Sequence, residues 1–469
     1  MWDLRQYGNN TLAIDDSGKS ISYSMFEEEC NLLAKIIGRR CVVFILCENS
    51  IGSIIGYVGC VNNKIVPVLL NANLEKTLLN SLIDTYRPEY IWLPKSKEDD
   101  FITYDEVYFS WGYSLIRTTV SEDYSINSDL CLLLTTSGST GSPKFVRQSY
   151  DNVLSNAKAI VSYLNIDQSE RPITTLPMNY TYGLSIINSH ILTGATLLIT
   201  DKGLMQKEFW KFFSEQGATS FGGVPYTYEM LKRLKFFNMD LPSLRYMTQA
   251  GGKITPELHK LFAEYAAVTG KKFIVMYGQC EATARMGYLP AEMSIKKCGS
   301  MGIAIPGGTF KVVNTDGQII EEPYVTGELV YEGDNVTLGY AECIADLAKG
   351  DERNKILHTG DMAQFDEDGY YYIVGRKKRF LKIYGNRVNL DEIDRLIKGH
   401  FEDVEVACSG IDDHLYIFIT KEEFANNVKN YVVSTTKLNQ AAFKVIVIDE
   451  IPKNDSGKVL YKELNKFFT

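Results

Sequence analysis

The stretch "LLLTTSGSTGSPKFVRQS" (Leu132–Ser149) decides how this chain is interpreted. Eight consecutive residues, 135–142, are Ser, Thr or Gly; they follow an apolar run and end in Pro143 and Lys144. We predict a strand, a glycine-rich loop and then a helix. Glycines let backbone N–H groups turn toward an anion, hydroxyls add donors, and a lysine adds positive charge. A flexible linker has a similar composition, but the close coupling to an apolar strand favours a phosphate-binding loop. It is not a Walker A loop, because Gly138 and Gly141 are only three apart and Pro143 precedes the lysine.

The sequence around this loop predicts a layered α/β architecture. Residues 41–70 contain two apolar runs separated by a helical pattern, which predicts a strand–helix–strand unit. Similar short runs predict strands at 90–94, 195–200, 218–224 and 271–278, and helices at 150–163 and 205–216. Such alternation is typical of mostly parallel sheets covered by helices.

The pattern changes toward the C-terminus. Residues 302–374 contain short strands and turns, including hairpin signals at 315–317 and 366–369, which predict a small antiparallel β subdomain. A basic run, 376–379, follows. The remainder predicts helices at 390–399 and about 426–442, with strands at 404–410, 415–420 and 443–449. We therefore expect a core of residues 1–378, with the β subdomain at about 302–378, and a small α+β C-terminal lid of residues 379–469.

Composition limits the classes of function. The chain has 469 residues, 45% hydrophobic and 23% charged, as in ordinary globular proteins. Its net charge of −9 argues against a nucleic-acid partner. The nine scattered cysteines form no C-x-x-C pair and suggest free thiols in a reducing cytoplasm. We expect no signal peptide and no membrane span, because polar residues interrupt the most apolar region, Cys41–Leu70.

Three further segments carry chemistry-bearing residues. In "VMYGQCEAT" (275–283), Tyr277 could stack on a flat base and Glu281 could ligate Mg²⁺. Between 358 and 388, Asp361 suits a pair of sugar hydroxyls and is followed by Arg376. The polar loop "PKNDSGKVL" (452–460) carries Lys458. Taken singly, each segment has an ordinary structural explanation: a buried tyrosine, a turn-capping aspartate, a solvated lysine.

In order and spacing, however, these segments resemble the adenylate-forming superfamily, which includes acyl- and aryl-CoA synthetases, amino-acid adenylation domains and luciferases. TTSGSTGSPK resembles its phosphate loop and YGQCE its Y-G-x-T-E motif. TGD (359–361) and GRKKRFLKIYGNRVNLDEI resemble its ribose and hinge motifs, and PKNDSGK its catalytic-lysine loop. Further matches are GVP (223–225), GGK (251–253) and GELVYEG (327–333). The match covers almost the full chain.

The resemblance implies a fold and a reaction. Family members have a large N-terminal domain of two α/β subdomains plus a β subdomain, and a small C-terminal domain that rotates between two poses. They join a carboxylate to ATP, release pyrophosphate and pass the acyl group to a thiol. We accordingly expect an AMP-forming acid–thiol ligase that uses ATP, Mg²⁺ and a small-molecule carboxylic acid, with coenzyme A or a phosphopantetheine thiol as acceptor.

The resemblance also assigns roles to residues. Lys458 would bridge the carboxylate and the α-phosphate as the catalytic lysine, Glu281 would carry Mg²⁺, and Asp361 with Arg376 would hold the ribose. Gly251, Gly252, Tyr277, Gly278 and Cys280 would line the nucleotide and acyl sites. The residues that would hold the pyrophosphate end of ATP are Thr136, Ser137, Gly138, Ser139, Thr140, Gly141 and Lys144. The residues that would line the substrate pocket are Tyr180, Thr181, Gly223, Lys382 and Gly385. Arg379 matches the hinge position.

Two departures from the family pattern bear on function. Cys280 replaces the usual Thr, and a thiol is a weaker hydrogen-bond donor than a hydroxyl. Amino-acid-activating members place an Asp near Thr181, but this sequence has no acidic residue between Arg171 and Thr200. Since a buried ammonium without a partner is costly, we favour an acyl or aryl acid.

Alternatives stay open at this point. The chain could load a separate carrier protein or an amine, including with an amino-acid substrate, or it could be an inactive nucleotide-binding protein. With the chain ending at Thr469, we expect any acceptor to be a free molecule. The acid, the acceptor and the oligomeric state are not given by the sequence.

Overall fold

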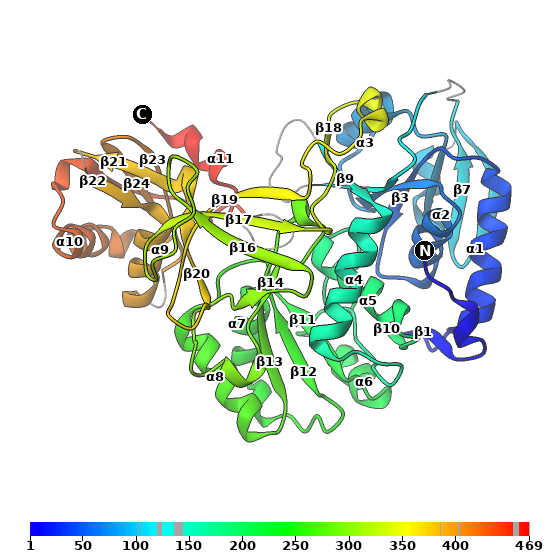
Figure 1. Cartoon of the computed structure of the whole chain (residues 1–469), viewed down its shortest axis with the longest axis horizontal. Coiled ribbons are helices and arrows are strands. Elements are labelled where there is room, and N and C mark those ends of the chain that lie inside the picture. Colours follow the sequence, from blue (N-terminus) through cyan, green and yellow to red (C-terminus); the bar gives the residue numbers. More distant parts are fainter. Residues whose placement is uncertain are drawn as a thin grey trace. The chain divides into compact units, whose positions relative to one another are not determined.

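Figure 1 shows the computed structural model of the chain, which describes residues 1–101, 103–119, 124–135, 144–384, 386–401, 404–453 and 459–468. These residues form two compact units. The first comprises Met1–Thr309 with Tyr331–Leu357, and the second Phe310–Val330 with His358–Thr469. Within the described ranges, no helix is long and apolar enough to cross a membrane.

An eight-stranded sheet with the order β18-β9-β8-β4-β3-β5-β7-β6 organises the first unit (Figure 1). The four central strands β8, β4, β3 and β5 are parallel, while β9, β18, β7 and β6 run antiparallel at the two sides. The strands are β3 (Val42–Cys47), β4 (Val66–Asn71), β5 (Tyr90–Pro94), β6 (Asp105–Ser110), β7 (Tyr113–Arg117), β8 (Leu130–Thr135), β9 (Phe145–Ser149) and β18 (Gly339–Ala341).

Both faces of this sheet are buried, because alternate residues of each strand enter different cores. In β3, Val43 and Ile45 pack with helices α1 (Tyr23–Ile37) and α2 (Ile51–Asn62), whereas Phe44 and Leu46 pack with α3 (Lys76–Tyr86). The period-two alternation of strand side chains makes this inevitable once helices cover both faces. The predicted strand–helix–strand unit at 41–70 is confirmed as β3, α2 and β4.

A second sheet of the first unit has the order β11-β12-β13-β14-β15. Its strands are β11 (Ser220–Gly223), β12 (Tyr246–Gln249), β13 (Lys272–Tyr277), β14 (Gly287–Tyr288) and β15 (Ile303–Ala304), and its flanking helices are α6 (Lys207–Glu215), α7 (Pro225–Arg233) and α8 (Pro256–Val268). The first three strands are parallel. A small third sheet contains β10 (Leu197–Ile199), β1 (Thr11–Asp15) and β2 (Ser20–Ser22).

Helices α4 (Tyr150–Leu164) and α5 (Thr181–Leu192) pack together between the two large sheets (Figure 1). Ile187 of α5 enters the core of the eight-stranded sheet, whereas Tyr182 of the same helix packs with β12 and β13. The predicted mostly parallel α/β core is therefore confirmed in both sheets, with antiparallel strands at both edges of the eight-stranded sheet and at one edge of the second.

The opening stretch differs from its prediction in one respect. The glycine-rich loop is followed by strand β9, which pairs antiparallel with β8, and not directly by a helix. All five residues of β9 are buried, and its Phe and Val are strand formers. The helix α4 begins only after Ser149, whose hydroxyl accepts from the Asn152 amide while Asn152 Oδ1 accepts from the Ser149 amide.

The second unit is built from smaller sheets. A four-stranded sheet has the order β16-β17-β19-β20, from β16 (Gly308–Val313), β17 (Gly327–Gly333), β19 (Ile356–Phe365) and β20 (Tyr371–Arg376). After it come β21 (Phe380–Ile383), β22 (Asn386–Asn389), α9 (Leu390–His400), β23 (Val406–Ile411), β24 (His414–Ile419), α10 (Ala425–Thr436), β25 (Phe443–Val447) and α11 (Tyr461–Leu464).

Residues from 381 onward have a hydrophobic core of their own, which includes Leu381, Ile393, Ile417 and Val428. Helix α10 ends at Thr436, six residues before its predicted end, because Lys437 takes a left-handed conformation. The predicted division into a core of 1–378 and a lid of 379–469 stays a prediction.

Candidate active site

Three of the predicted site segments meet at one edge of the second sheet. Strands β11, β12 and β13 are parallel, with Gly223 opposite Gln249 and Gln249 opposite Val275. Their carboxyl ends therefore bring Gly223, Gly251 and Tyr277 to the same edge. Ligands of α/β proteins bind outside the carboxyl ends of parallel strands, so this edge is the candidate site.

The predicted substrate-pocket residues lie beside this edge. Gly251 has φ +81°, and a Cβ on it would lie 2.5 Å from Tyr180 Oη, so only glycine fits there. Burial, followed by the neighbouring Cys280 and Tyr182, raises the pKa of Tyr180. The structure thus brings Tyr180, Gly251 and Cys280 together, from three segments that are far apart in the sequence.

Thr181 begins α5 and is buried. Its hydroxyl donates a hydrogen bond to the carbonyl of Thr283, just beyond Glu281. A cavity of about 10 Å³ lies next to it and is lined by further polar side chains, among them Asn156, Ser185 and Asn188. This volume suits about one water molecule. The hydrogen bond of Thr181 therefore connects the start of α5 to the segment that contains Glu281.

The Glu281 segment is tightly fixed. A Cβ on Gly278 would lie 1.7 Å from the carbonyl oxygen of Ala284, so the chain turns back on itself where only hydrogen fits. The Glu281 carbonyl accepts from the amide of Thr337 at 3.0 Å and from Arg353 Nη1 at 2.9 Å. These bonds fix the backbone from which the Glu281 carboxylate projects.

Tyr340, on β18, connects Glu281 with Lys144. Its hydroxyl donates to Glu281 Oε1 at 2.7 Å, and Lys144 Nζ lies 3.9 Å from the centre of its ring. The Arg353 guanidinium lies 4.7 Å from the same ring centre. Cations are attracted to the face of an aromatic ring. One half-buried tyrosine therefore holds both the predicted phosphate-loop lysine and the predicted magnesium ligand.

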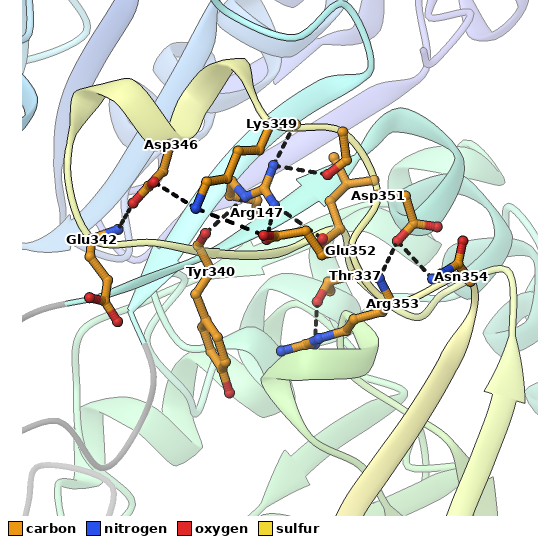
Figure 2. A network of polar contacts seen from close by, with 12 residues as sticks. Arg147, Thr337, Tyr340, Glu342, Asp346, Lys349, Asp351, Glu352, Arg353 and Asn354 are labelled. Atoms are coloured by element: carbon orange, nitrogen blue, oxygen red, sulfur yellow. Dashed lines mark hydrogen bonds and ion pairs between the residues drawn. The ribbon is translucent and has the colours of Figure 1, made fainter.

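The strand that carries Tyr340 is anchored by Arg147 of β9 (Figure 2). This guanidinium is fully buried and donates to the carbonyls of Tyr340 at 3.0 Å and Leu338 at 3.1 Å, and also to those of Lys349 and Gly350. It forms an ion pair with Glu352 as well. Arg147 therefore clamps residues 338–352 onto the strand that follows the glycine-rich loop.

The Glu281 carboxylate fits a magnesium ligand. Within the described part of the chain, its Oε1 accepts one hydrogen bond, from Tyr340, and its Oε2 has no partner. Mg²⁺ binds one or two carboxylates and completes its shell with water and phosphate oxygens. Burial, followed by the Glu281 charge, raises the pKa of Tyr340, so its hydroxyl stays protonated and donates to the carboxylate.

The predicted ribose-binding pair lies in the second unit. Asp361 of β19 and Arg376 of β20 are directly opposite in the antiparallel pairing, and Arg376 Nε lies 3.3 Å from Asp361 Oδ1. The Asp361 amide donates to Thr359 Oγ1 at 3.1 Å. The structure therefore brings together two side chains separated by fifteen residues. Their ribose contact stays a prediction.

The remaining predicted residues are less informative. Gly252 lies beside Pro225, and a Cβ there would come within 3.1 Å of the proline ring. Lys382 lies on β21 opposite Arg387 of β22, where the structure describes its backbone. Outside the described residues lie Thr136, Ser137, Gly138, Ser139, Thr140, Gly141, Gly385 and Lys458.

Sequence reasoning missed Tyr340, Arg353 and Arg147. Tyr340 lies seven residues beyond the GELVYEG match, Arg147 lies in the opening stretch three residues beyond Lys144 but was given no role, and Arg353 lies in none of the matched motifs. Their contacts join residues far apart in the chain, such as 147 with 338 and 281 with 340. Only the pairing of β18 with β9 reveals them.

Comparisons with known proteins identify the family. A family model described as AMP-binding enzyme matches residues 2–341. An oxalate–CoA ligase of Arabidopsis thaliana is 28% identical over 377 residues, 74% of this chain and 71% of that protein. A 2-succinylbenzoate–CoA ligase of Oceanobacillus iheyensis is 25% identical over 474 residues, 96% of this chain and 95% of that protein.

Solved structures show the same fold. The o-succinylbenzoate CoA synthetase (MenE) of Bacillus subtilis has TM-scores of 0.79 with the acyl-adenylate OSB-AMP and 0.78 with ATP and magnesium. Both alignments are 21% identical, and cover 98% of this chain and 97% or 98% of MenE. With its family model spanning more than two thirds of its length, the chain belongs to the AMP-binding enzyme family, within the adenylate-forming superfamily.

Proposed function

We propose that the chain is an AMP-forming acid–CoA ligase. A carboxylate oxygen attacks the α-phosphorus of ATP, the bond to the bridging oxygen of the β-phosphate breaks, and pyrophosphate leaves. The thiolate sulfur of coenzyme A then attacks the acyl carbon, and AMP leaves. The observation that carries this proposal is the convergence of Lys144 and Glu281 on Tyr340, beside the strand ends where Gly251 and Tyr277 lie.

Charge explains why these residues suit the first step. A carboxylate must approach a highly anionic nucleotide, so fixed cations and donors have to offset the repulsion. Lys144 is held 3.9 Å above the Tyr340 ring and is therefore oriented before the nucleotide arrives. Mg²⁺ held by Glu281 would neutralise phosphate charge. Preorganised groups of this kind stabilise the transition state without reorganising during the reaction.

The other nucleotide contacts are proposals that rest on the family. Tyr277 ends β13 and would flank the adenine, and its hydroxyl accepts from Gln279 Nε2 at 3.2 Å. Asp361 and Arg376 would hold the ribose hydroxyls. Lys458 would bridge the carboxylate and the α-phosphate. Removal of a single stabilising donor in such sites typically lowers turnover by about 10²–10³-fold.

The acid is proposed to lack an α-ammonium group. Thr181, at the position where amino-acid-activating relatives carry Asp, already donates its hydroxyl to the Thr283 carbonyl. The acids named for the two relatives above, oxalate and 2-succinylbenzoate, also contain no amine. We expect carboxylic acids to drive pyrophosphate exchange better than their α-amino counterparts. A clear preference for a free amino acid would contradict this.

Coenzyme A is the proposed acceptor, and the phosphopantetheine arm of a free carrier protein is the alternative. Both present the same thiol, so the geometry of the adenylation site does not separate them. A cytoplasmic location is also proposed, supported by nine cysteines that are all free thiols.

The deciding experiment is ATP–pyrophosphate exchange with the purified chain over a panel of carboxylic acids. The active acid is then tested for thioester formation with coenzyme A and with a holo carrier protein. Exchange followed by coenzyme A consumption supports the proposal. Absence of exchange with every acid, in a protein that is folded, would instead favour an inactive nucleotide-binding protein.

A further inference from the structure

Arg285 is a buried cation with neutral surroundings. The residue is 3% exposed and lies four positions beyond Glu281. Nε donates to Ser185 Oγ at 3.1 Å, and Nη1 donates to Tyr163 Oη at 3.0 Å and approaches Met276 Sδ at 3.3 Å. Its guanidinium carbon lies 5.3 Å from the centre of the Tyr182 ring. In the described part of the chain, therefore, no carboxylate pairs with this charge.

The remaining ionisable groups nearby do not supply the missing charge. Burial lowers the pKa of His190 to about 3, so its ring is neutral at physiological pH. Burial raises the pKa of Tyr163, so its hydroxyl stays protonated and this side chain is also neutral. Glu170 is an acidic group near this cluster: burial, followed by the Glu170 charge, raises the pKa of Tyr246. Glu170 is already paired with Arg245 at 2.9 Å.

An arginine buried without a carboxylate is energetically unfavourable. Desolvating a charge costs several kcal/mol unless opposite charge or good hydrogen bonds compensate. Three neutral acceptors and one ring face offset part of that cost. Nη2 has no hydrogen bond in the described part of the chain, so it retains donors for a further partner. Arginine with an open donor edge suits the planar oxygens of a carboxylate.

The position of Arg285 connects it to the acid site. Its partners Tyr182 and Ser185 both lie on α5, which begins at Thr181 of the predicted pocket. The cavity of about 10 Å³ beside Thr181 is bounded by Ser185 and by Ala284, the neighbour of Arg285. Ser185, which accepts a hydrogen bond from Arg285 Nε, therefore lies about one helical turn from Thr181 at the predicted acid-binding end of α5, and Arg285 reaches it from the segment that follows Glu281.

We propose that Arg285 binds a second carboxylate of the substrate, so that the acid activated by this chain is a dicarboxylic acid. The inference rests on the proposed function. One carboxylate would react with ATP, while the other would meet the guanidinium and supply the counter-charge. A neutral group in place of the second carboxylate would leave the charge of Arg285 without a counter-charge, and an ammonium group there would be repelled.

The test compares matched acids in ATP–pyrophosphate exchange with the wild-type chain. Each pair differs by a carboxylate replaced with a methyl group: succinate with butyrate, glutarate with pentanoate, adipate with hexanoate, and phthalate with 2-methylbenzoate. We expect at least one diacid to exceed its partner by about tenfold or more in kcat/KM, as expected for a charged hydrogen bond. Equal or better exchange by every monoacid would overturn the inference and leave the proposed function intact.

Three variants assign the effect to this residue. Arg285→Met, which has a similar length and no charge, should lose the preference for the diacid while it retains exchange with the monoacid. Arg285→Lys should keep part of the preference. Arg245→Met, which removes an arginine that already has a carboxylate partner, should leave the preference unchanged. A diacid preference that persists in folded Arg285→Met would show that another group binds the second carboxylate. If that variant does not fold, the wild-type comparison still decides the inference.

Discussion

At the scale of single residues, Tyr340 connects the two charged groups of the candidate site. Its ring lies beneath Lys144 and Arg353, and its hydroxyl donates to Glu281. The ring and the hydroxyl do different things: the ring positions cations, and the hydroxyl orients the carboxylate. Substitutions that remove one or both functions can separate them.

We expect Tyr340→Phe to lower kcat/KM for ATP by about tenfold, because a hydrogen bond to a charged group contributes about 1.5–3 kcal/mol and 1.4 kcal/mol corresponds to tenfold. Tyr340→Leu should lower it further, because the cation–π contacts with Lys144 and Arg353 are lost as well. The Mg²⁺ concentration for half-maximal activity should rise in both variants. If Tyr340→Phe kept the wild-type kcat/KM and the wild-type Mg²⁺ requirement, the hydroxyl would not orient Glu281 during turnover.

Cys280 is the second residue with a specific expectation. It is buried at the start of a short 3₁₀ turn that also contains Glu281. If its side chain contacts the α-phosphate, Cys280→Thr should preserve or raise kcat, because a hydroxyl is a better donor at similar volume. Cys280→Val should lower kcat by about threefold to tenfold with a smaller effect on ATP affinity, since the contact strengthens as charge develops. Equal kinetics for Val and wild type would exclude the contact.

At the scale of elements, the clamp between β9 and β18 determines where Tyr340 lies. Arg147 is fully buried, whereas the side chain of its ionic partner Glu352 is 47% exposed. The guanidinium also donates hydrogen bonds to four backbone carbonyls, to which the Glu352 carboxylate cannot donate. Removal of either partner therefore breaks the same ion pair with very different consequences.

Arg147→Met is expected to destabilise the chain by about 3 kcal/mol or more, because buried carbonyls lose their donors. Glu352→Gln should cost less than about 1 kcal/mol, as is usual for a solvent-exposed partner. The midpoint of urea unfolding measures both. Similar losses for the two variants would mean that the ion pair, and not the carbonyl contacts, holds residues 338–352 in place.

At the scale of the whole molecule, the residues of the predicted hinge and lid belong to the second unit, and their movement stays a prediction. Arg379 is buried there; its Nη2 lies 2.8 Å from Asp394, its Nη1 donates to the Cys408 carbonyl at 2.9 Å, and its guanidinium lies 3.7 Å above the Tyr461 ring. This side chain is therefore anchored inside the second unit. A substitution such as Arg379→Pro would remove that anchor in addition to restricting φ, so it does not isolate rotation.

The two half-reactions test the lid more directly. Lys458→Ala should reduce adenylate formation by at least about 10²-fold, yet leave thiol transfer from supplied acyl-adenylate close to wild type. Gly385→Leu should do the reverse, because a side chain would obstruct the thiol where the family has only hydrogen. Each step is assayed separately for each variant. Equal losses in both steps for both variants would contradict a division of labour between these residues.

The sequence by itself determined the order of elements and the family. Local patterns suffice for this: β3, α2 and β4 follow from period-two and helical periodicity, and the family motifs are short and contiguous. Glu281, Asp361 and Lys144 were identified because each lies in such a motif. The strand β9 was mistaken for part of a loop and helix, because five residues carry little periodicity.

Only the tertiary structure decided which side chains meet. Tyr340 joins Lys144 to Glu281 because β18 pairs with β9, although the residues are 59 to 196 positions apart along the chain. Among the residues that the structure describes, Arg285 has no carboxylate partner, because the helices α4 and α5 and strand β13 surround it with tyrosine, serine and methionine. Pairing and burial of distant segments depend on the whole packed chain. No local pattern encodes them, and in our proposal they set the charge balance on which the choice of acid depends.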